Sequence, residues 1–131
     1  MKALLIFLVG LVLVFGALAL LISMSGEPKR VFVVIDSSFP MRQVWNQVPG
    51  TLDDIESQGY SEFALATEKD SVHSWQERPQ FRDANAFAPC DFSRIDAYRE
   101  ATEADELVLI TTGGSCPTDA LADWRVITLQ P

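Results

Sequence analysis

The feature that most constrains this chain is an unbroken apolar run at its N-terminus. Every residue from Ala3 to Ile22 is apolar or glycine. At about 1.5 Å per helical residue, a helix over this run is roughly 30 Å long, the thickness of the hydrocarbon core of a bilayer. The whole chain has 131 residues, which leaves room for one modest domain. The predicted organisation is a transmembrane anchor over 1–26 with residues 3–24 in the lipid, a linker over 27–30 and one domain over 31–131.

A cleaved signal peptide is the alternative to a retained anchor, because Lys2 begins a positively charged N-terminal region. The apolar region of a signal peptide has about 7 to 15 residues and ends at a small-residue cleavage site. The run here is longer, and the candidate site around Ser23 and Ser25 is a poor one. The sequence therefore favours a retained anchor.

The side of the membrane on which the domain lies is not fixed by charge. Lys29, Arg30 and Arg42 follow the apolar run, whereas Lys2 alone precedes it, and this count favours a cytoplasmic C-terminus. The very short N-terminal tail favours the opposite, signal-anchor arrangement. The charges of the sequence leave both orientations open.

The residues after the apolar run are acidic. All eighteen Asp and Glu residues lie there, against nine of the ten Lys and Arg residues. Binding to nucleic acid needs a basic patch or stripe, and the sequence shows none. We therefore expect no nucleic-acid partner and a well-solvated, acidic surface.

Apolar runs rich in β-branched residues alternate with helical patterns. Such runs, bounded by turn residues, are typical of strands buried on both faces of a parallel sheet. The predicted strands are "VFVVI" (31–35), "EFALAT" (62–67), a short one at "SVHSW" (71–75), "ELVLITTGG" (106–114) and "RVITL" (125–129). The helical patterns lie in 41–58, 92–105 and 115–124. We therefore predict an α/β domain with a small, mainly parallel sheet of Rossmann type and helices on both faces.

The first helical pattern carries an apolar face and an internal break. Its apolar residues recur at three- and four-residue spacings: Val44, Trp45, Val48, Leu52 and Ile55. The Pro49–Gly50 pair interrupts the pattern, and Thr51 followed by Asp54 resembles a new N-cap. We therefore predict a kinked helix, or two short helices, ending at Gly59.

Polar residues stand where the predicted strands end. Asp36, Ser37 and Ser38 follow the first strand, and 67–70 and 111–116 follow two others. In open parallel sheets, ligands bind beyond the carboxyl ends of the strands. These ends are therefore the candidate functional site.

The same residues resemble the von Willebrand factor A domain. "VFVVIDSSFPM" is similar to its first strand and metal loop, whose pattern is Asp-x-Ser-x-Ser. "SEFALATEKDSVHSW" resembles its second strand and the hairpin partner that follows, and "ELVLITTGG" resembles its fourth strand. The resemblance covers about 30–129, in a shorter form than usual, and implies a metal-ion-dependent adhesion site at the strand ends.

The positions of that site are degenerate in this chain. The family holds a divalent ion with the Asp and two Ser of the first loop, a Thr and a second Asp. Asp36 and Ser38 match, whereas Pro40, Cys90 and Thr112 stand where the other three ligands belong. Since Mg²⁺ needs about six oxygen ligands, we expect no metal and no cofactor. Asp36 and Ser38 then serve as strand-end caps that bind loop amides.

The resemblance places Cys90 and Cys116 on the second and third loops around this site. We predict that they form a disulfide that replaces the missing ion as the link between loops. The alternative is two unrelated buried thiols. A disulfide requires an oxidising compartment, and it therefore favours a periplasmic or extracellular domain.

Two classes of function remain from the sequence. The first is a non-catalytic interaction or assembly module that binds protein partners in or beside a membrane complex, as the resemblance implies. The second is an enzyme, in which Asp36 serves in phosphotransfer or Cys116 with Cys90 in thiol redox chemistry. Ser38 stands where such a phosphotransfer site needs a second acid, and the Cys-x-x-Cys spacing is absent. The first class is therefore the prediction.

Overall fold

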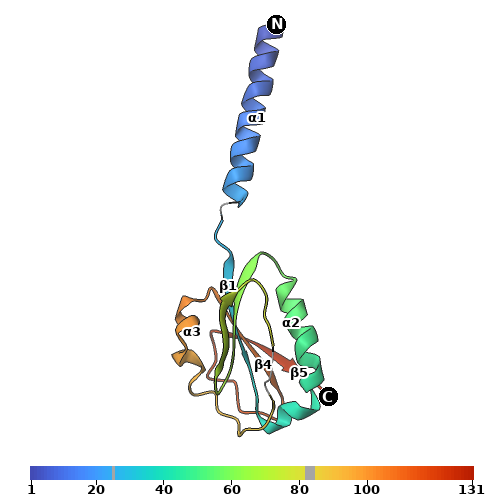
Figure 1. The fold of residues 1–131 in the computed structure, drawn as a ribbon, viewed down its shortest axis with the longest axis vertical. Helices are drawn as coiled ribbons and strands as arrows, with labels where there is room; N and C mark the ends of the chain where they lie inside the picture. The colour runs from blue at the N-terminus through green and yellow to red at the C-terminus, as the bar shows by residue number, and fades with distance from the viewer. Residues whose placement is uncertain (25, 82–84) are drawn as a thin grey trace.

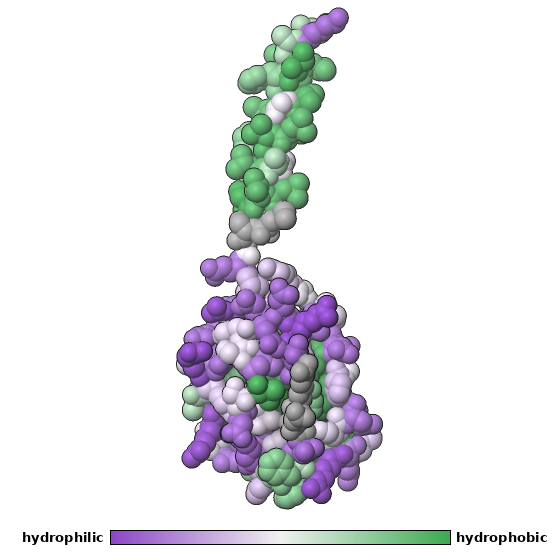
Figure 2. Space-filling view, in the orientation of Figure 1, coloured by the Kyte–Doolittle hydropathy of each residue, from purple (hydrophilic) through white to green (hydrophobic). Residues whose placement is uncertain are grey.

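The chain consists of one isolated N-terminal helix and an α/β domain (Figure 1). A computed structural model describes residues 1–24, 26–81 and 85–131. Helix α1 (Lys2–Met24) has a mean hydropathy of 3.1 over its membrane-length window, and none of that window is buried against the domain. Figure 2 shows apolar side chains covering α1 and mostly hydrophilic ones on the visible face of the domain. The helix is thus long and apolar enough to cross a membrane.

Five strands form the single sheet of the domain, in the order β3-β2-β1-β4-β5. They are β1 (Lys29–Ile35), β2 (Ser61–Thr67), β3 (Ser71–Gln76), β4 (Glu106–Thr112) and β5 (Trp124–Leu129). Only β3 is antiparallel to its neighbour; the other pairings are parallel. The predicted α/β class with a mainly parallel sheet is confirmed. Strand β1 lies at the centre of the sheet. Val31–Ile35 is buried on both faces there, as its continuous apolar run predicts.

One face of the sheet packs against the segment that follows β1. This segment forms two 3₁₀ turns, η1 (Phe39–Gln43) and η2 (Trp45–Gln47), and then helix α2 (Val48–Glu56). Its predicted apolar face is confirmed. Four of its residues are buried in the hydrophobic core on this face of the sheet: Val44, Val48, Leu52 and Ile55. The segment is divided into short helical elements, as predicted, but the boundary lies between Gln47 and Val48 and not at Pro49–Gly50. Pro49 lies in the first turn of α2, where its missing N–H leaves no hydrogen bond unmade.

The N-cap predicted at Thr51 is also wrong, because α2 already includes that residue. The Thr51 hydroxyl donates to the carbonyl of Gln47 at 2.9 Å, one turn earlier. The helix then ends at Glu56, a few residues before Gly59.

The opposite face of the sheet packs against residues from 92–104. The continuous helix predicted over 92–105 is wrong, because this segment forms a 3₁₀ turn, η3 (Ile95–Ala97), and a short helix α3 (Arg99–Glu103). Tyr98 separates them in an extended conformation. Its hydroxyl donates to the Thr67 carbonyl at 2.7 Å, and its ring centroid lies 5.6 Å from that of Phe32. These contacts with the sheet favour the extended backbone at Tyr98 over a helical one.

The helix predicted within 115–124 is absent, and turns connect β4 to β5. The Leu121 amide donates to the Thr118 carbonyl at 3.0 Å, and the Trp124 amide to the Leu121 carbonyl at 3.1 Å. This connection must return the chain from one end of the parallel strands to the other, roughly 20 Å. A helix over its eleven residues would reach only about 16 Å. The more open turns span the distance.

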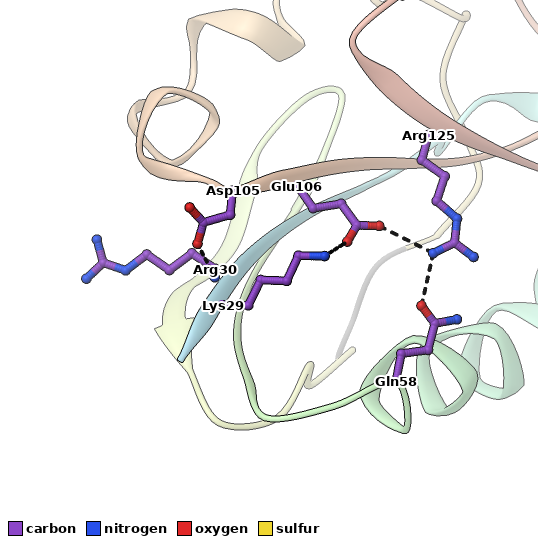
Figure 3. Close-up of polar contacts among 6 residues, drawn as sticks. All are labelled: Lys29, Arg30, Gln58, Asp105, Glu106 and Arg125. Carbon is purple, nitrogen blue, oxygen red and sulfur yellow. Dashed lines mark hydrogen bonds and ion pairs between the residues drawn. The ribbon is translucent and has the colours of Figure 1, made fainter. Parts of the chain in front are cut away.

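A network of ion pairs and hydrogen bonds joins the strands at the amino edge of the sheet, which is the end where the parallel strands begin, next to the linker. Figure 3 shows its six residues: Lys29, Arg30, Gln58, Asp105, Glu106 and Arg125. Glu106 pairs with Lys29 and, at 3.3 Å, with Arg125. The Arg30 amide donates to the Asp105 carboxylate at 2.9 Å. The Lys29 hydrogen bond, followed by that of Arg125, lowers the pKa of Glu106. The first residues of β1 are thereby fixed to β4.

Candidate functional site

The carboxyl edge of the sheet concentrates the buried polar side chains of the domain. In the part of the chain that the structure describes, all of them follow or end β1, β2 and β4: Asp36, Ser37, Ser38, Thr67, Glu68 and Thr111. Three strands running in parallel bring these positions together, as the sequence predicts. Burying polar groups is unfavourable unless they are hydrogen-bonded. Their partners therefore indicate what the site does.

Asp36 is completely buried and both of its carboxylate oxygens accept hydrogen bonds. Oδ1 accepts from the Ser38 amide at 2.8 Å, and Oδ2 accepts from the Thr111 hydroxyl at 2.8 Å. The Asp36 amide donates to the Ile110 carbonyl at 2.9 Å and continues the pairing of β1 with β4. The geometry is that of a cap that ties two strand ends together.

Glu68 is a second buried carboxylate at this edge. It lies in the predicted polar segment 67–70, but the sequence assigned it no role of its own. Its Oε2 accepts from the Ser37 amide at 2.7 Å and from the Ser37 hydroxyl at 3.0 Å. Its Oε1 is buried without a hydrogen-bond partner. Burial raises the pKa of Glu68, the hydrogen bonds from Ser37 oppose this rise, and the nearby charge of Asp36 adds to it. The available signal was an acidic residue directly after a predicted buried strand.

Two of the five positions matched to the family's metal ligands come together, namely Asp36 and Ser38. Pro40 packs against the turn after β4, where a Cβ on Gly114 would lie 3.3 Å from the Pro40 Cβ. The Thr112 hydroxyl donates to the Leu129 carbonyl at 2.9 Å, and Thr111 contacts Asp36 in its place. Within 1–24, 26–81 and 85–131, no three His, Cys, Asp or Glu side chains are grouped as metal ligands. The lack of a metal stays a prediction.

Cys90, the remaining matched position, lies at disulfide distance from Cys116, as predicted, with Cα atoms 5.7 Å apart. The bond joins the segment after β3 to the turn after β4. Beside it, the Ser38 and Ser115 hydroxyl oxygens lie 3.2 Å apart. The helical pattern over 115–124, which includes Cys116, forms no helix in the structure, and turns follow Cys116. The loops at this edge are therefore linked by a disulfide and by hydroxyl contacts.

The outer surface of the same edge carries exposed aromatic side chains. Phe39 is 50% exposed and Phe87 is 60% exposed. Their segments lie side by side, because the Phe39 amide donates to the Ala88 carbonyl at 3.0 Å and the Phe87 amide to the Ser37 carbonyl at 2.9 Å. This surface was not identified from the sequence, in which Phe39 and Phe87 follow no helical or strand period.

Arg42 lies between these aromatic residues. Its Nε donates to the Ala86 carbonyl at 2.7 Å, and its guanidinium carbon lies 5.2 Å from the centre of the Phe39 ring. A pocket of about 290 Å³ opens beside it, and its lining residues are Arg42, Trp45, Asn85, Ala86 and Phe87. We call the surface formed by Phe39, Arg42, Trp45 and Phe87 the aromatic rim.

The aromatic rim lies at the end of the domain opposite to α1. Strand β1 has seven residues and runs directly from the linker to this edge (Figure 1). At about 3.3 Å per residue, the rim is roughly 20 Å from the point at which the chain leaves the linker. The rim and the linker therefore lie at opposite ends of β1.

Comparison of the chain with protein-family models, with curated protein sequences and with solved structures finds no match. The function proposed for it therefore depends on its own residues and geometry.

Proposed function

We propose that this protein is a membrane-anchored, non-catalytic module for protein interaction or assembly, which binds a protein partner through the aromatic rim. In this proposal α1 is a retained single-pass anchor and the domain lies on the periplasmic or extracellular side. The domain is a short relative of the von Willebrand factor A domain that works without a metal ion. The observation that carries the proposal is the aromatic rim itself.

The distribution of exposed apolar side chains supports binding at the rim. Within the described residues of the domain, the exposed large hydrophobic side chains are those of Phe39, Tyr60 and Phe87. Two of these three flank Arg42 at one edge. Aromatic and arginine side chains are the residues most enriched among those that dominate binding energy at protein interfaces. Their grouping on an otherwise hydrophilic domain favours a protein partner.

The contacts beneath the rim support a role that needs no ion. Asp36 joins β1 to β4 through Thr111, and the disulfide joins the two loops above them. In this proposal, the hydrogen bond and the disulfide hold the loops together in place of a shared ion. Neither Asp36 nor Glu68 is exposed to solvent as a nucleophile would be.

The pairing and packing of the sheet support the family resemblance. Strand β3 is the antiparallel hairpin partner of β2, which the resemblance implies. Residues of α2 and residues near α3 belong to different core clusters, which is the pattern expected for helices on both faces. The disulfide supports an oxidising compartment and thus the external side of the membrane.

Chemical crosslinking in native membranes tests the proposal. We expect the full-length chain to crosslink to a specific partner protein and Phe39→Ser/Phe87→Ser to lose that product. Tyr60→Ser is the matched control, because Tyr60 is 79% exposed but lies just before β2, at the amino edge. Retention of the product by the double variant, or its absence from the wild type, would refute binding at the rim. An unchanged circular dichroism spectrum shows that each variant is folded.

A further inference from the structure

We infer that the aromatic rim recognises an acidic segment of its protein partner, in which a carboxylate lies beside an apolar side chain. Arg42 binds the carboxylate, and the pocket between Trp45 and Phe87 receives the apolar side chain. This inference rests on the proposed function and assigns the chemistry of the partner.

The first observation is that Arg42 is held in place before any partner binds. The Ala86 carbonyl fixes its Nε, and the face of Phe39 packs on its guanidinium plane. The hydrogen bond uses one of the five N–H donors of the guanidinium. The planar fork that remains matches a carboxylate. Because the side chain is already ordered, less conformational entropy is lost on binding.

The second observation is that Arg42 has no acidic partner within the described residues. Five other basic residues of the domain do form ion pairs: Lys29, Arg30, Arg78, Arg99 and Arg125. The acids at the edge near Arg42, Asp36 and Glu68, are buried and engaged with loop groups. A fixed arginine without a partner on a protein of net charge −8 marks a local site for an external carboxylate.

The overall negative charge does not prevent such binding. At physiological ionic strength, charges separated by more than about 8 Å are largely screened. Acids that lie farther than this from Arg42 therefore repel a short acidic segment at the rim only weakly. The same screening limits attraction of Arg42 to anionic lipid, which α1 holds at the other end of the domain.

The third observation is the size and lining of the pocket. Its volume of about 290 Å³ lies at the lower limit for sites that enclose a small-molecule ligand. Trp45 and Phe87 supply apolar walls, while Arg42 and Asn85 supply polar groups. One apolar side chain with a neighbouring carboxylate fits this combination. A segment of a folded or disordered partner supplies both groups together.

The experiment uses two synthetic peptides with Gly-Ser ends. In the Glu peptide Phe alternates with Glu, and in the Gln peptide Phe alternates with Gln. The full-length protein is held in nanodiscs of neutral lipid, and binding is measured by fluorescence anisotropy. We expect the Glu peptide to bind the wild type, and Arg42→Gln to weaken this binding at least about tenfold, as for a hydrogen-bonded charge. The Gln peptide should bind weakly and equally to both proteins. Arg94→Gln is the matched control, since Arg94 is also exposed and forms no ion pair within the described residues.

Several outcomes overturn the inference. They are equal binding of the Glu and Gln peptides, no binding of either peptide, and equal loss in Arg42→Gln and Arg94→Gln. Self-association of the wild type that Arg42→Gln abolishes would identify a second copy of the chain as the occupant. Binding of empty anionic vesicles that depends on Arg42 would identify lipid.

The crosslinking experiment separates this inference from the proposed function. If Phe39→Ser/Phe87→Ser loses the partner while Arg42→Gln retains it fully, the rim binds a protein but not through a carboxylate. If the double aromatic variant retains the partner, the proposed function itself fails. The two failures therefore give different patterns in the same membranes.

Discussion

Two buried carboxylates at one sheet edge differ in how completely the protein satisfies them. Asp36 accepts a hydrogen bond at each oxygen, from Ser38 and from Thr111. Glu68 accepts two hydrogen bonds at one oxygen and none at the other. Asp36 is thus expected to stabilise the fold through both of these hydrogen bonds. Burial raises the pKa of Glu68, and the hydrogen bonds from Ser37 offset only part of this rise.

Replacing Asp36 with alanine should destabilise the domain by about 3 kcal/mol, because two buried donors lose their acceptor. Asp36→Asn should cost much less, since a carboxamide has the same shape. Its oxygen can accept from the Ser38 amide, and its NH₂ group can donate to the Thr111 hydroxyl, which then changes from donor to acceptor. Urea denaturation followed by tryptophan fluorescence measures both losses. Equal losses in the two variants would show that the charge of Asp36, rather than its hydrogen bonds, is required. A rise in wild-type stability with millimolar MgCl₂ would contradict the predicted lack of a metal.

Replacing Glu68 with glutamine should change how stability depends on pH. In the unfolded chain Glu68 titrates near its ordinary pKa of 4.5, and in the folded domain its pKa is raised. Between these two pKa values the folded state binds more protons than the unfolded state, so the Glu68 contribution to stability falls as pH rises. Wild type should therefore gain stability relative to Glu68→Gln as the pH is lowered from neutral towards the unfolded pKa. Urea denaturation of both proteins across this range measures the difference, and parallel curves would contradict the raised pKa.

At the scale of the elements, the strands were predictable and the connections were not. Runs such as Val31–Ile35 carry a strand signal because every residue is buried, whatever packs against them. The break at Tyr98 depends on its contacts with Phe32 and Thr67, which no local pattern reveals. The lack of a helix before β5 depends on the distance to be spanned.

The candidate site shows the same division between local and tertiary information. Asp36 and Ser38 were predictable, because they directly follow a recognisable strand. Glu68 and Thr111 lie within the predicted polar strand ends, but their individual roles were not predicted, since these depend on the register of β2 and β4 against β1. The rim was missed because Phe39 and Phe87 are 48 positions apart in the chain and meet only through the pairing of their loops.

The disulfide is the covalent link between elements, and its removal should weaken the fold substantially. Cys90 and Cys116 are 26 positions apart, and closing a loop of this length stabilises a domain by about 3 to 4 kcal/mol in the chain-entropy model. Cys90→Ser/Cys116→Ser should lower the free energy of unfolding by about this amount. Reductant should destabilise the wild type similarly and leave the double variant unchanged. Alkylation of native, unreduced protein followed by mass spectrometry should find neither thiol modified; two modified thiols would refute the bond.

At the scale of the whole molecule, β1 places the linker to α1 and the aromatic rim at opposite ends of the domain. The linker enters the sheet at its amino edge, where Lys29 and Arg30 are fixed to Glu106 and Asp105 (Figure 3). The strand then carries the chain to the opposite edge, where the rim lies. Under the proposed function, a domain built in this way would present the aromatic rim to partners beyond the membrane surface, while its amino-terminal end stays close to the lipid.

The disulfide and the orientation of the anchor should be coupled. If α1 is the proposed single-pass anchor, external protease should digest the domain in intact cells. Alkaline carbonate should then leave the full-length chain in the membrane fraction. Gly26→Lys/Glu27→Lys adds positive charge directly after α1 and should turn a fraction of molecules so that the domain faces inwards. In these protease-protected molecules, Cys90 and Cys116 should be reduced and should react with a permeant maleimide after lysis. A disulfide in the inward-facing fraction, or a wild-type domain protected from protease, would contradict the external placement.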